Sequence, residues 1–179
     1  TAMLSLPIVF AASRLHWLVD GLLACLLMMP QAAQAAAPAV ALYYGRTIPL
    51  EEFRTFDIVV VEPDHGHDPV RYQASGSTLY AYVSVAEAHP SRAYYANIPP
   101  SWKMARNGQW NSDVLDQTPE AWPDFFATRV VGPLWERGYK GFFLDTLDSY
   151  RLAEKFDETA QQEGLVRVIE TLHRRFPGI

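Results

Sequence analysis

The sequence has a single cysteine, Cys25, which lies in an N-terminal segment that we expect to be removed. The rest of the chain therefore offers neither a disulfide nor a thiol nucleophile. Positive charge is also scarce, because 15 lysines and arginines stand against 20 aspartates and glutamates, for a formal charge of -5. Without a basic stripe, we expect no binding to nucleic acid or to an anionic membrane surface. The 179 residues suffice for one domain with a sizeable core.

The sequence also lacks an apolar run long enough to form a stable membrane span. Its most apolar stretch, residues 22–29, follows Arg14 and His16 and precedes an A-x-A sequence at residues 33–35. A positive flank, a short apolar core and small residues in this order are typical of a secretory signal peptide. We therefore predict that residues 1–35 are a signal peptide and that the mature protein is periplasmic or secreted. A protein of an export machinery is then a candidate partner.

Four apolar runs are typical of strands that are buried on both faces of a parallel sheet. They cover residues 40–44, 58–62, 79–85 and 141–145. Apolar residues at helical spacing lie between them and after them, in a short segment at 49–53, in a longer one from Trp122 to a stop at Gly138, and from Leu165 to Phe176. Alternating strands and helices indicate an α/β fold with right-handed crossovers.

The segment from Glu87 to Thr118 interrupts this alternation, and we expect a long ordered loop there. It carries Trp102, Trp110 and the tight-turn pair Asn107-Gly108. Loops of this length inside a compact domain are usually functional or disordered. The tryptophans either lend an aromatic surface to a ligand or pack locally, and the sequence leaves both interpretations open.

Acidic residues gather at the ends of the predicted strands. Glu62 ends the second strand, Glu87 follows the third, and Asp145 ends the fourth with Asp148 close behind. In a parallel barrel these ends share one face, and cleavage of a glycosidic bond needs two carboxyl groups. Asp145 is the best catalytic candidate, because a buried strand would fix its position. Asp148 has a helix N-cap as its alternative role, and Glu62 a hydrogen bond to a loop backbone.

A possible metal motif lies just after the second strand, where His65 and His67 are flanked by Asp64 and Asp68. A His-x-His at a strand end is a ligand pattern of barrel metallohydrolases. A site would also need ligands from elsewhere, and His89 and His173 are the remaining histidines after the signal segment. A solvated loop explains the motif better, and we predict no metal or other cofactor.

Five segments carry a resemblance to a known family. They are Tyr43-Tyr44-Gly45, Val61-Glu62-Pro63, residues 81–87, residues 107–111 and residues 141–148. Through them, the chain from residue 36 onward resembles the endo-α-1,4-polygalactosaminidase-type glycoside hydrolases. The resemblance implies a TIM-like (β/α)8 barrel, of which residues 36–179 supply the N-terminal half, ending near the start of strand five.

The resemblance also implies an activity. It is the hydrolysis of an α-1,4-linked galactosamine or N-acetylgalactosamine exopolysaccharide of the Pel type, in biofilm polysaccharide processing. The strand-four acid of the family corresponds to Asp145, whereas its second acid, a glutamate, lies on a later strand, past Ile179. The hydrolase is therefore an enzyme when complete, and we expect residues 36–179 alone to be inactive.

We predict that the polysaccharide contacts five residues, because acids pair with hydroxyl or amino groups and aromatic faces stack on sugar rings. These substrate-binding candidates are Tyr44, Glu62, Glu87, Trp110 and Asp148. Two other functions remain open at this point. One is a non-catalytic sugar-binding barrel, and the other is a metal-dependent amidohydrolase that uses His65 and His67.

Overall fold

The computed structural model describes residues 37–73 and 77–179 of the chain. The predicted signal peptide, residues 1–35, lies outside the described residues. Within the described part, no helix is both long enough and apolar enough to cross a membrane.

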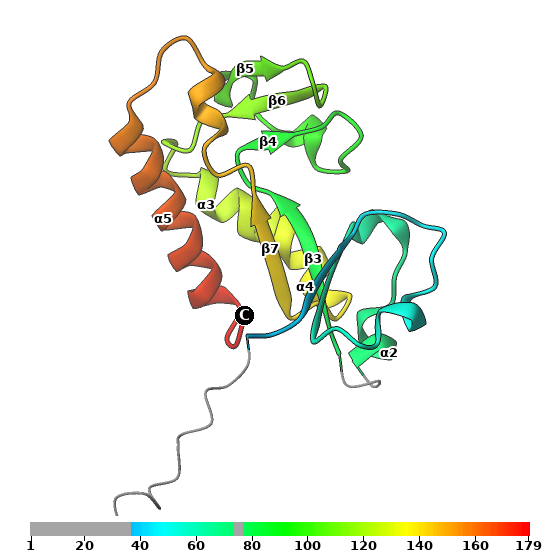
Figure 1. Cartoon of the computed structure of the whole chain (residues 1–179). Helices are drawn as coiled ribbons and strands as arrows, with labels where there is room; N and C mark the ends of the chain where they lie inside the picture. The colour runs from blue at the N-terminus through cyan, green and yellow to red at the C-terminus, as the bar shows by residue number, and fades with distance from the viewer. Residues whose placement is uncertain (1–36, 74–76) are drawn as a thin grey trace, which may run out of the picture. The chain divides into compact units, whose positions relative to one another are not determined.

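A four-stranded parallel sheet forms the centre of the described chain (Figure 1). Its order is β1-β2-β3-β7, and each neighbouring pair is parallel. The strands are β1 (Val40–Tyr43), β2 (Ile58–Val61), β3 (Thr78–Ser84) and β7 (Gly141–Asp145). All four predicted strands are confirmed to within about a residue at their ends. Because the strands are parallel, their C-terminal ends meet at one edge of the sheet.

Helical segments follow each of these strands, as the α/β prediction requires. The early ones are the short η1 (Leu50–Phe53), η2 (Pro63–His65) and α2 (Pro69–Gln73). Between β3 and β7 lie α3 (Trp122–Phe125), η5 (Phe126–Val131) and α4 (Gly132–Glu136). After β7 come η6 (Ser149–Leu152) and the 18-residue α5 (Glu158–Arg175). The described chain thus contains four strand–helix units.

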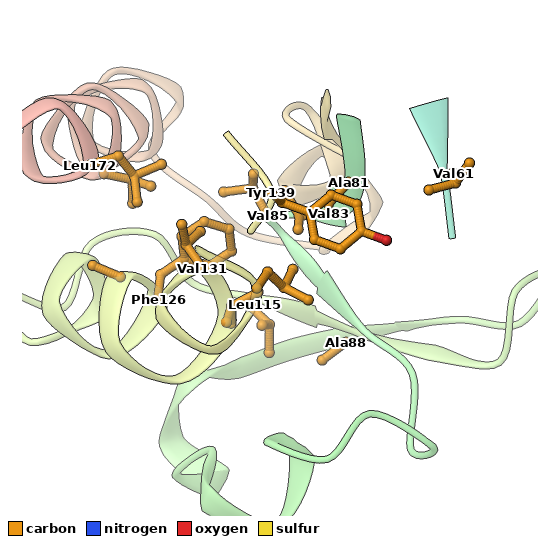
Figure 2. Close-up of a cluster of buried hydrophobic side chains, with 14 of the residues drawn as sticks. Val61, Ala81, Val83, Val85, Ala88, Leu115, Phe126, Val131, Tyr139 and Leu172 are labelled. Atoms are coloured by element: carbon orange, nitrogen blue, oxygen red, sulfur yellow. The ribbon is translucent and has the colours of Figure 1, made fainter. Parts of the chain in front are cut away.

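The main core lies between one face of this sheet and the helices α3, η5, α4 and α5 (Figure 2). Alternate residues of the two central strands point into it and are essentially inaccessible to solvent: Val59, Val61, Leu79, Ala81 and Val83. The helices contribute Phe126, Val131 and Leu172. Trp122 is also fully buried, and its indole N–H donates to Gln117 Oε1 at 2.7 Å. This apolar burial is the largest stabilising contribution to the fold.

The opposite face of the sheet is much less covered. Leu42 of β1 is 56% exposed and Phe143 of β7 is 37% exposed, although each has sequence neighbours that pack on the core. Because successive strand residues point to opposite faces, the same face carries Tyr82, Ser84 and Asp145. We call this face the pocket face and the other the helix face.

The helix predicted from Trp122 to Gly138 is continuous but not uniform. Its middle part, η5, is π-helical, and the N–H of Gly132 bonds to the carbonyl of Ala127, five residues earlier. Pro133 follows at once, and a proline has no N–H and clashes with the carbonyl four residues before it. The wider π turn avoids this clash, as π-bulges often do within helices.

The segment from Glu87 to Thr118 is not the plain loop that we expected. It contains a second, antiparallel sheet in the order β4-β6-β5, with η3 (Tyr95–Asn97) and η4 (Pro100–Trp102) before β5. Its strands are β4 (Glu87–Ala88), β5 (Lys103–Asn107) and β6 (Ser112–Leu115). The strands are short, and a register shift interrupts the β5–β6 pairing, so their alternation is too brief to recognise in the sequence. Only the turn of the β5–β6 hairpin was predicted from the sequence, from the pair Asn107-Gly108.

The last helix, α5, begins at its N-cap Asp157, whose side chain accepts from the N–H of Ala160 at 3.1 Å. Leu172 of the predicted apolar stripe is buried, but Ile169 is 39% exposed. The stripe is therefore confirmed only in part. At Gly164 the helix packs directly against the backbone of Gln117, since an added Cβ would lie 2.0 Å from the Gln117 carbonyl oxygen.

Candidate active site

An open pocket of about 420 Å³ lies at the C-terminal edge of the parallel sheet. It is lined by residues from all four parallel strands or the loops just after them, and by the hairpin β5–β6. The lining residues are Tyr44, Glu62, Tyr82, Ser84, Glu87, His89, Arg92, Trp110, Ser112, Asp145 and Thr146. Five of the six residues predicted for the site, all but Asp148, therefore meet in one pocket. This edge is where parallel barrels carry their catalytic groups.

Asp145 is the last residue of β7, and it is held there through its backbone and its side chain. Its carbonyl accepts from the N–H of Val85 at 2.9 Å, and its Oδ2 accepts from the Tyr82 hydroxyl at 2.7 Å. None of the residues that the structure describes donates to Oδ1. One carboxylate oxygen is thus fixed by the protein, while the other is left for a substrate or a reacting atom.

Thr146, directly after Asp145, has an unusual backbone conformation, with a φ of +64°. This left-handed region is strained for a β-branched residue and is often found at functional sites. The Thr146 hydroxyl donates to the Asp145 carbonyl at 2.6 Å, lies 2.8 Å from Ser84 Oγ and accepts from the N–H of Ala86 at 3.1 Å. These bonds stabilise the turn that follows the carboxylate.

Two tyrosines stand beside Asp145. The rings of Tyr44 and Tyr82 meet edge to face with centroids 5.1 Å apart, and Tyr82 also stacks on Phe143 at 6.3 Å. Burial, the hydrogen bond to Asp145 and its charge raise the pKa of Tyr82 well above its usual value. Burial and the negative charges of Asp145 and Glu62 likewise raise the pKa of Tyr44. Both phenols therefore remain neutral hydrogen-bond donors at any physiological pH.

Glu62 forms a bidentate ion pair with Arg92. Arg92 Nη1 lies 2.6 Å from Glu62 Oε1 and Nη2 lies 2.9 Å from Oε2, while Nη1 also reaches Asp64 Oδ2 at 2.8 Å. Burial alone would raise the pKa of Glu62, but the hydrogen bonds and charge of Arg92 outweigh it and lower that pKa. Glu62 is therefore ionised in the pocket and is a poor proton donor. Its Oε1 also accepts from the N–H of Asp64 at 3.2 Å, so the predicted loop-backbone bond is present as well.

Glu87 is 5% exposed, at the base of the antiparallel sheet. Its Oε1 accepts from Asn107 Nδ2 at 3.1 Å and from the Ser149 hydroxyl at 2.6 Å. Its Oε2 accepts from the same Asn107 amide at 3.3 Å and from the Ser112 hydroxyl. The carboxylate is thus surrounded by neutral donors from three different segments of the chain.

Trp110 lies in the turn between β5 and β6 and is 66% exposed. Trp102, by contrast, packs against Trp122 with ring centroids 5.8 Å apart and joins the core. The two roles considered for these tryptophans, local packing and an aromatic surface for a ligand, therefore fall to different residues. Trp102 is a packing residue, and Trp110 presents its indole to the pocket.

Asp148 does not line the pocket. It is exposed and precedes η6 in the N-cap position, but its side chain makes no capping hydrogen bond. His65 and His67 also lie outside the pocket, with His65 Nδ1 3.1 Å from the carbonyl oxygen of Gly45. Within residues 37–73 and 77–179, no group of three or more histidine, cysteine, aspartate or glutamate side chains is placed to hold a metal ion.

Sequence reasoning missed several lining residues, among them Tyr82, Arg92 and Thr146. The alternation of strand three signals Tyr82, since it points away from the core face that Ala81 and Val83 occupy. No sequence pattern predicts that Arg92 lines the pocket, because it lies 30 residues from Glu62 in the chain and only the folded structure brings the two together.

Comparison with known proteins gives a family match over most of the chain. The model of glycoside-hydrolase family GH114 matches residues 28–177. Among curated protein sequences, none matches the chain.

Solved structures are also similar to the chain. The glycoside hydrolase domain of PelA from Pseudomonas aeruginosa is similar with 34% sequence identity and a TM-score of 0.63, over 80% of this chain and 58% of that one. Ega3 of Aspergillus fumigatus, solved with galactosamine, is 13% identical with a TM-score of 0.59, over 76% and 55% of the two chains. The α-galactosidase TtGalA of Thermus thermophilus is 17% identical with a TM-score of 0.55, over 75% and 36%. The present chain spans less than two thirds of each of these three structures. The predicted TIM-like α/β fold class is confirmed.

Proposed function

The chain belongs to glycoside-hydrolase family GH114, and on that premise we propose that its protein hydrolyses an α-1,4-linked galactosamine or N-acetylgalactosamine polysaccharide of the Pel type. The observation that carries the proposal is Asp145, a carboxylate at the end of a buried parallel strand, with one oxygen free in an open pocket. The similarity to the PelA hydrolase domain, and to a second hydrolase-fold structure solved with galactosamine, supports this substrate class.

Asp145 takes the role of nucleophile, or of the acid that stabilises the distorted sugar, in this proposal. The hydrogen bond from Tyr82 orients Oδ2 and leaves Oδ1 free to approach the anomeric carbon of a bound sugar. An ionised carboxylate suits either role, since the transition state of glycoside hydrolysis carries positive charge on the sugar ring.

The proton donor needs a carboxyl group that holds its proton near neutral pH. Glu62 does not fit, because its ion pair with Arg92 lowers its pKa. Glu87 is not placed to reach a sugar oxygen, because it is 5% exposed and protein donors occupy both of its oxygens. The family resemblance implies that the proton donor is a glutamate on a later strand than those described, and we propose that role for it.

The sugar chain is held by the remaining groups of the pocket. Trp110 offers an exposed indole face for stacking, and the neutral hydroxyl of Tyr44 can donate to a sugar oxygen. Glu62 keeps its negative charge and can pair with an amino or hydroxyl group at its accessible edge.

The test is cleavage of defined polymers by the full-length protein. Partly acetylated α-1,4-galactosamine polymer and β-1,4-glucosamine polymer are incubated with wild type and with Asp145→Asn, and new reducing ends are counted. We expect cleavage of the α-linked polymer only, with a loss of at least about 1000-fold in the variant. Cleavage by Asp145→Asn at the wild-type rate would remove Asp145 from the mechanism, and equal cleavage of both polymers would refute the substrate assignment.

One observation favours a second function, a non-catalytic sugar-binding barrel. Of the three acids in the described pocket, two are occupied by other protein groups. A protein that binds the α-linked polymer tightly but releases no reducing ends at any pH would support this function over hydrolysis.

We also propose that the protein acts outside the cytoplasm, in the processing of biofilm polysaccharide. The proposal rests on the signal-peptide pattern of residues 1–35 and on the polymeric substrate class. Cell fractionation and N-terminal sequencing of the mature protein test it. A mature chain that begins at Ala36 in the periplasm or medium is expected, and an unprocessed cytoplasmic chain would refute it.

A further inference from the structure

We infer that Glu87 is a positioning residue that fixes the turn carrying Trp110, and that it does not itself bind the sugar. The turn comprises residues 108–111, between Asn107 at the end of β5 and Ser112 at the start of β6. Glu87 contacts both of its ends, through the Nδ2 amide of Asn107 at 3.1 and 3.3 Å and through the hydroxyl of Ser112. The two hydrogen-bonded ends lie on either side of the exposed indole.

The carboxylate has no acceptor position left for a substrate. A carboxylate offers about four lone-pair sites, and Glu87 receives four hydrogen bonds, two on each oxygen. It is also 5% exposed, although it lines the pocket. A sugar hydroxyl could bond to it only by displacing one of the protein donors.

The turn itself depends on such contacts. Asn111 has a φ of +51°, in the left-handed region, and the N–H of Gln109 bonds back to Asn107 Oδ1 at 3.1 Å. Asn107 therefore uses its oxygen to shape the turn and its amide nitrogen to attach the turn to Glu87. Loss of the Glu87 acceptors would free the Asn107 side chain and the Trp110 indole with it.

Glu87 also connects this turn to the loop that follows Asp145. The Ser149 hydroxyl donates to Glu87 Oε1, and the N–H of Ser149 bonds to the carbonyl of Thr146 at 3.2 Å. A single carboxylate thus links the aromatic surface to the segment next to the catalytic candidate. The distance between Trp110 and Asp145 is set by protein contacts before any sugar binds.

The first measurement needs no substrate. Amide hydrogen exchange of residues 108–111 is compared in the wild-type chain, Glu87→Gln and Ser112→Ala. Glutamine keeps the shape but replaces one acceptor oxygen with an NH2 donor, so that position can no longer accept from the Asn107 amide. We expect exchange of these amides to be roughly 10-fold faster in Glu87→Gln, and less accelerated in Ser112→Ala. If Glu87→Gln fails to fold, Ser112→Ala alone decides the question.

Asp124→Asn is the matched control, because it also changes a hydrogen-bonded carboxylate to an amide. Asp124 accepts from Arg175 at 2.9 Å, in the helical layer outside the pocket. We expect it to leave exchange at residues 108–111 unchanged. Unchanged exchange in both Glu87→Gln and Ser112→Ala, or equal acceleration by Asp124→Asn, would overturn the inference.

The second measurement rests on the proposed function. Binding of α-1,4-galactosamine oligosaccharides is titrated for Trp110→Ala, Glu87→Gln and the double variant. We expect Trp110→Ala to weaken binding by roughly 10-fold, Glu87→Gln to weaken it by a similar or smaller factor, and the double variant to be no weaker than Trp110→Ala. Additive losses would mean that Glu87 contacts the sugar independently. If the wild type binds no oligosaccharide, the proposed function fails, while the exchange measurement still decides the role of Glu87.

Discussion

The two faces of the parallel sheet are built from neighbouring residues of the same strands, yet they differ in almost every property. On the helix face, Val83 and Leu144 belong to or pack on the apolar core. One residue further along each strand, Ser84 and Asp145 line the pocket. The helix face therefore supplies the stability that allows polar groups and the strained Thr146 to persist on the pocket face.

The largest expected effect comes from the pocket face as a whole. Leu42 and Phe143 are exposed on it, and β1 and β7 are the edge strands of the described sheet. Exposed apolar residues and open edges favour association with other strands. We predict that residues 36–179 alone are inactive on polymer, poorly stable, and prone to dimerise or aggregate.

Sedimentation, thermal unfolding and polymer cleavage of residues 36–179 test this prediction together. A cooperative monomer that cleaves polymer would show that the pocket face needs no further covering and no second carboxyl group from elsewhere.

The next effect concerns the helix face. Trp122 is fully buried and contacts Trp102, Phe125 and Phe126. Trp122→Ala in the full-length protein should destabilise the fold by about 4 kcal/mol, because it leaves a cavity and removes the donor to the buried Gln117 Oε1. Denaturant unfolding measures the loss. A change below about 1 kcal/mol would mean that the helix face is not the main source of stability.

A smaller effect is expected at the ion pair on the pocket face. Arg92→Gln should cost about 1 to 2 kcal/mol at pH 7, since the half-buried Glu62 loses its charged partner. Because Arg92 lowers the folded-state pKa of Glu62, this stability is present above the unfolded pKa and is lost as the pH falls through the folded one. The difference between wild type and variant should therefore shrink on acidification below about pH 4. A constant difference from pH 7 to pH 3 would contradict this origin.

The smallest effect on stability is expected for the exposed apolar residues of the pocket face when residues 36–179 are studied alone. Leu42→Ala should change the stability of residues 36–179 by no more than about 0.5 kcal/mol, because the side chain is mostly in solvent. The same change in the full-length protein should cost more if further strands cover this face. Equal effects in the two proteins would show that Leu42 stays exposed in both.

Local patterns predicted much of the fold. The four strands were visible because each is an apolar run bounded by glycine or proline, and Asp145 was visible because it directly follows such a run. The antiparallel sheet was missed because its strands are short and polar, and its pairing depends on Glu87 reaching β6 across 27 residues. The roles of Arg92 and Tyr82 depend on contacts 30 and 63 residues apart, which no local pattern contains.

The central claim is that the helix face stabilises the fold while the pocket face carries the chemistry. It is tested most directly at two adjacent residues of β7. Asp145→Asn and Leu144→Ala are made in the full-length protein, and polymer cleavage and Tm are measured for both. We predict that Asp145→Asn loses cleavage by at least about 1000-fold with Tm within roughly 2 °C of wild type, whereas Leu144→Ala lowers Tm by roughly 5 °C or more and keeps most of the cleavage at low temperature. Retained cleavage in Asp145→Asn, or a collapse of Tm there with none in Leu144→Ala, would contradict the account.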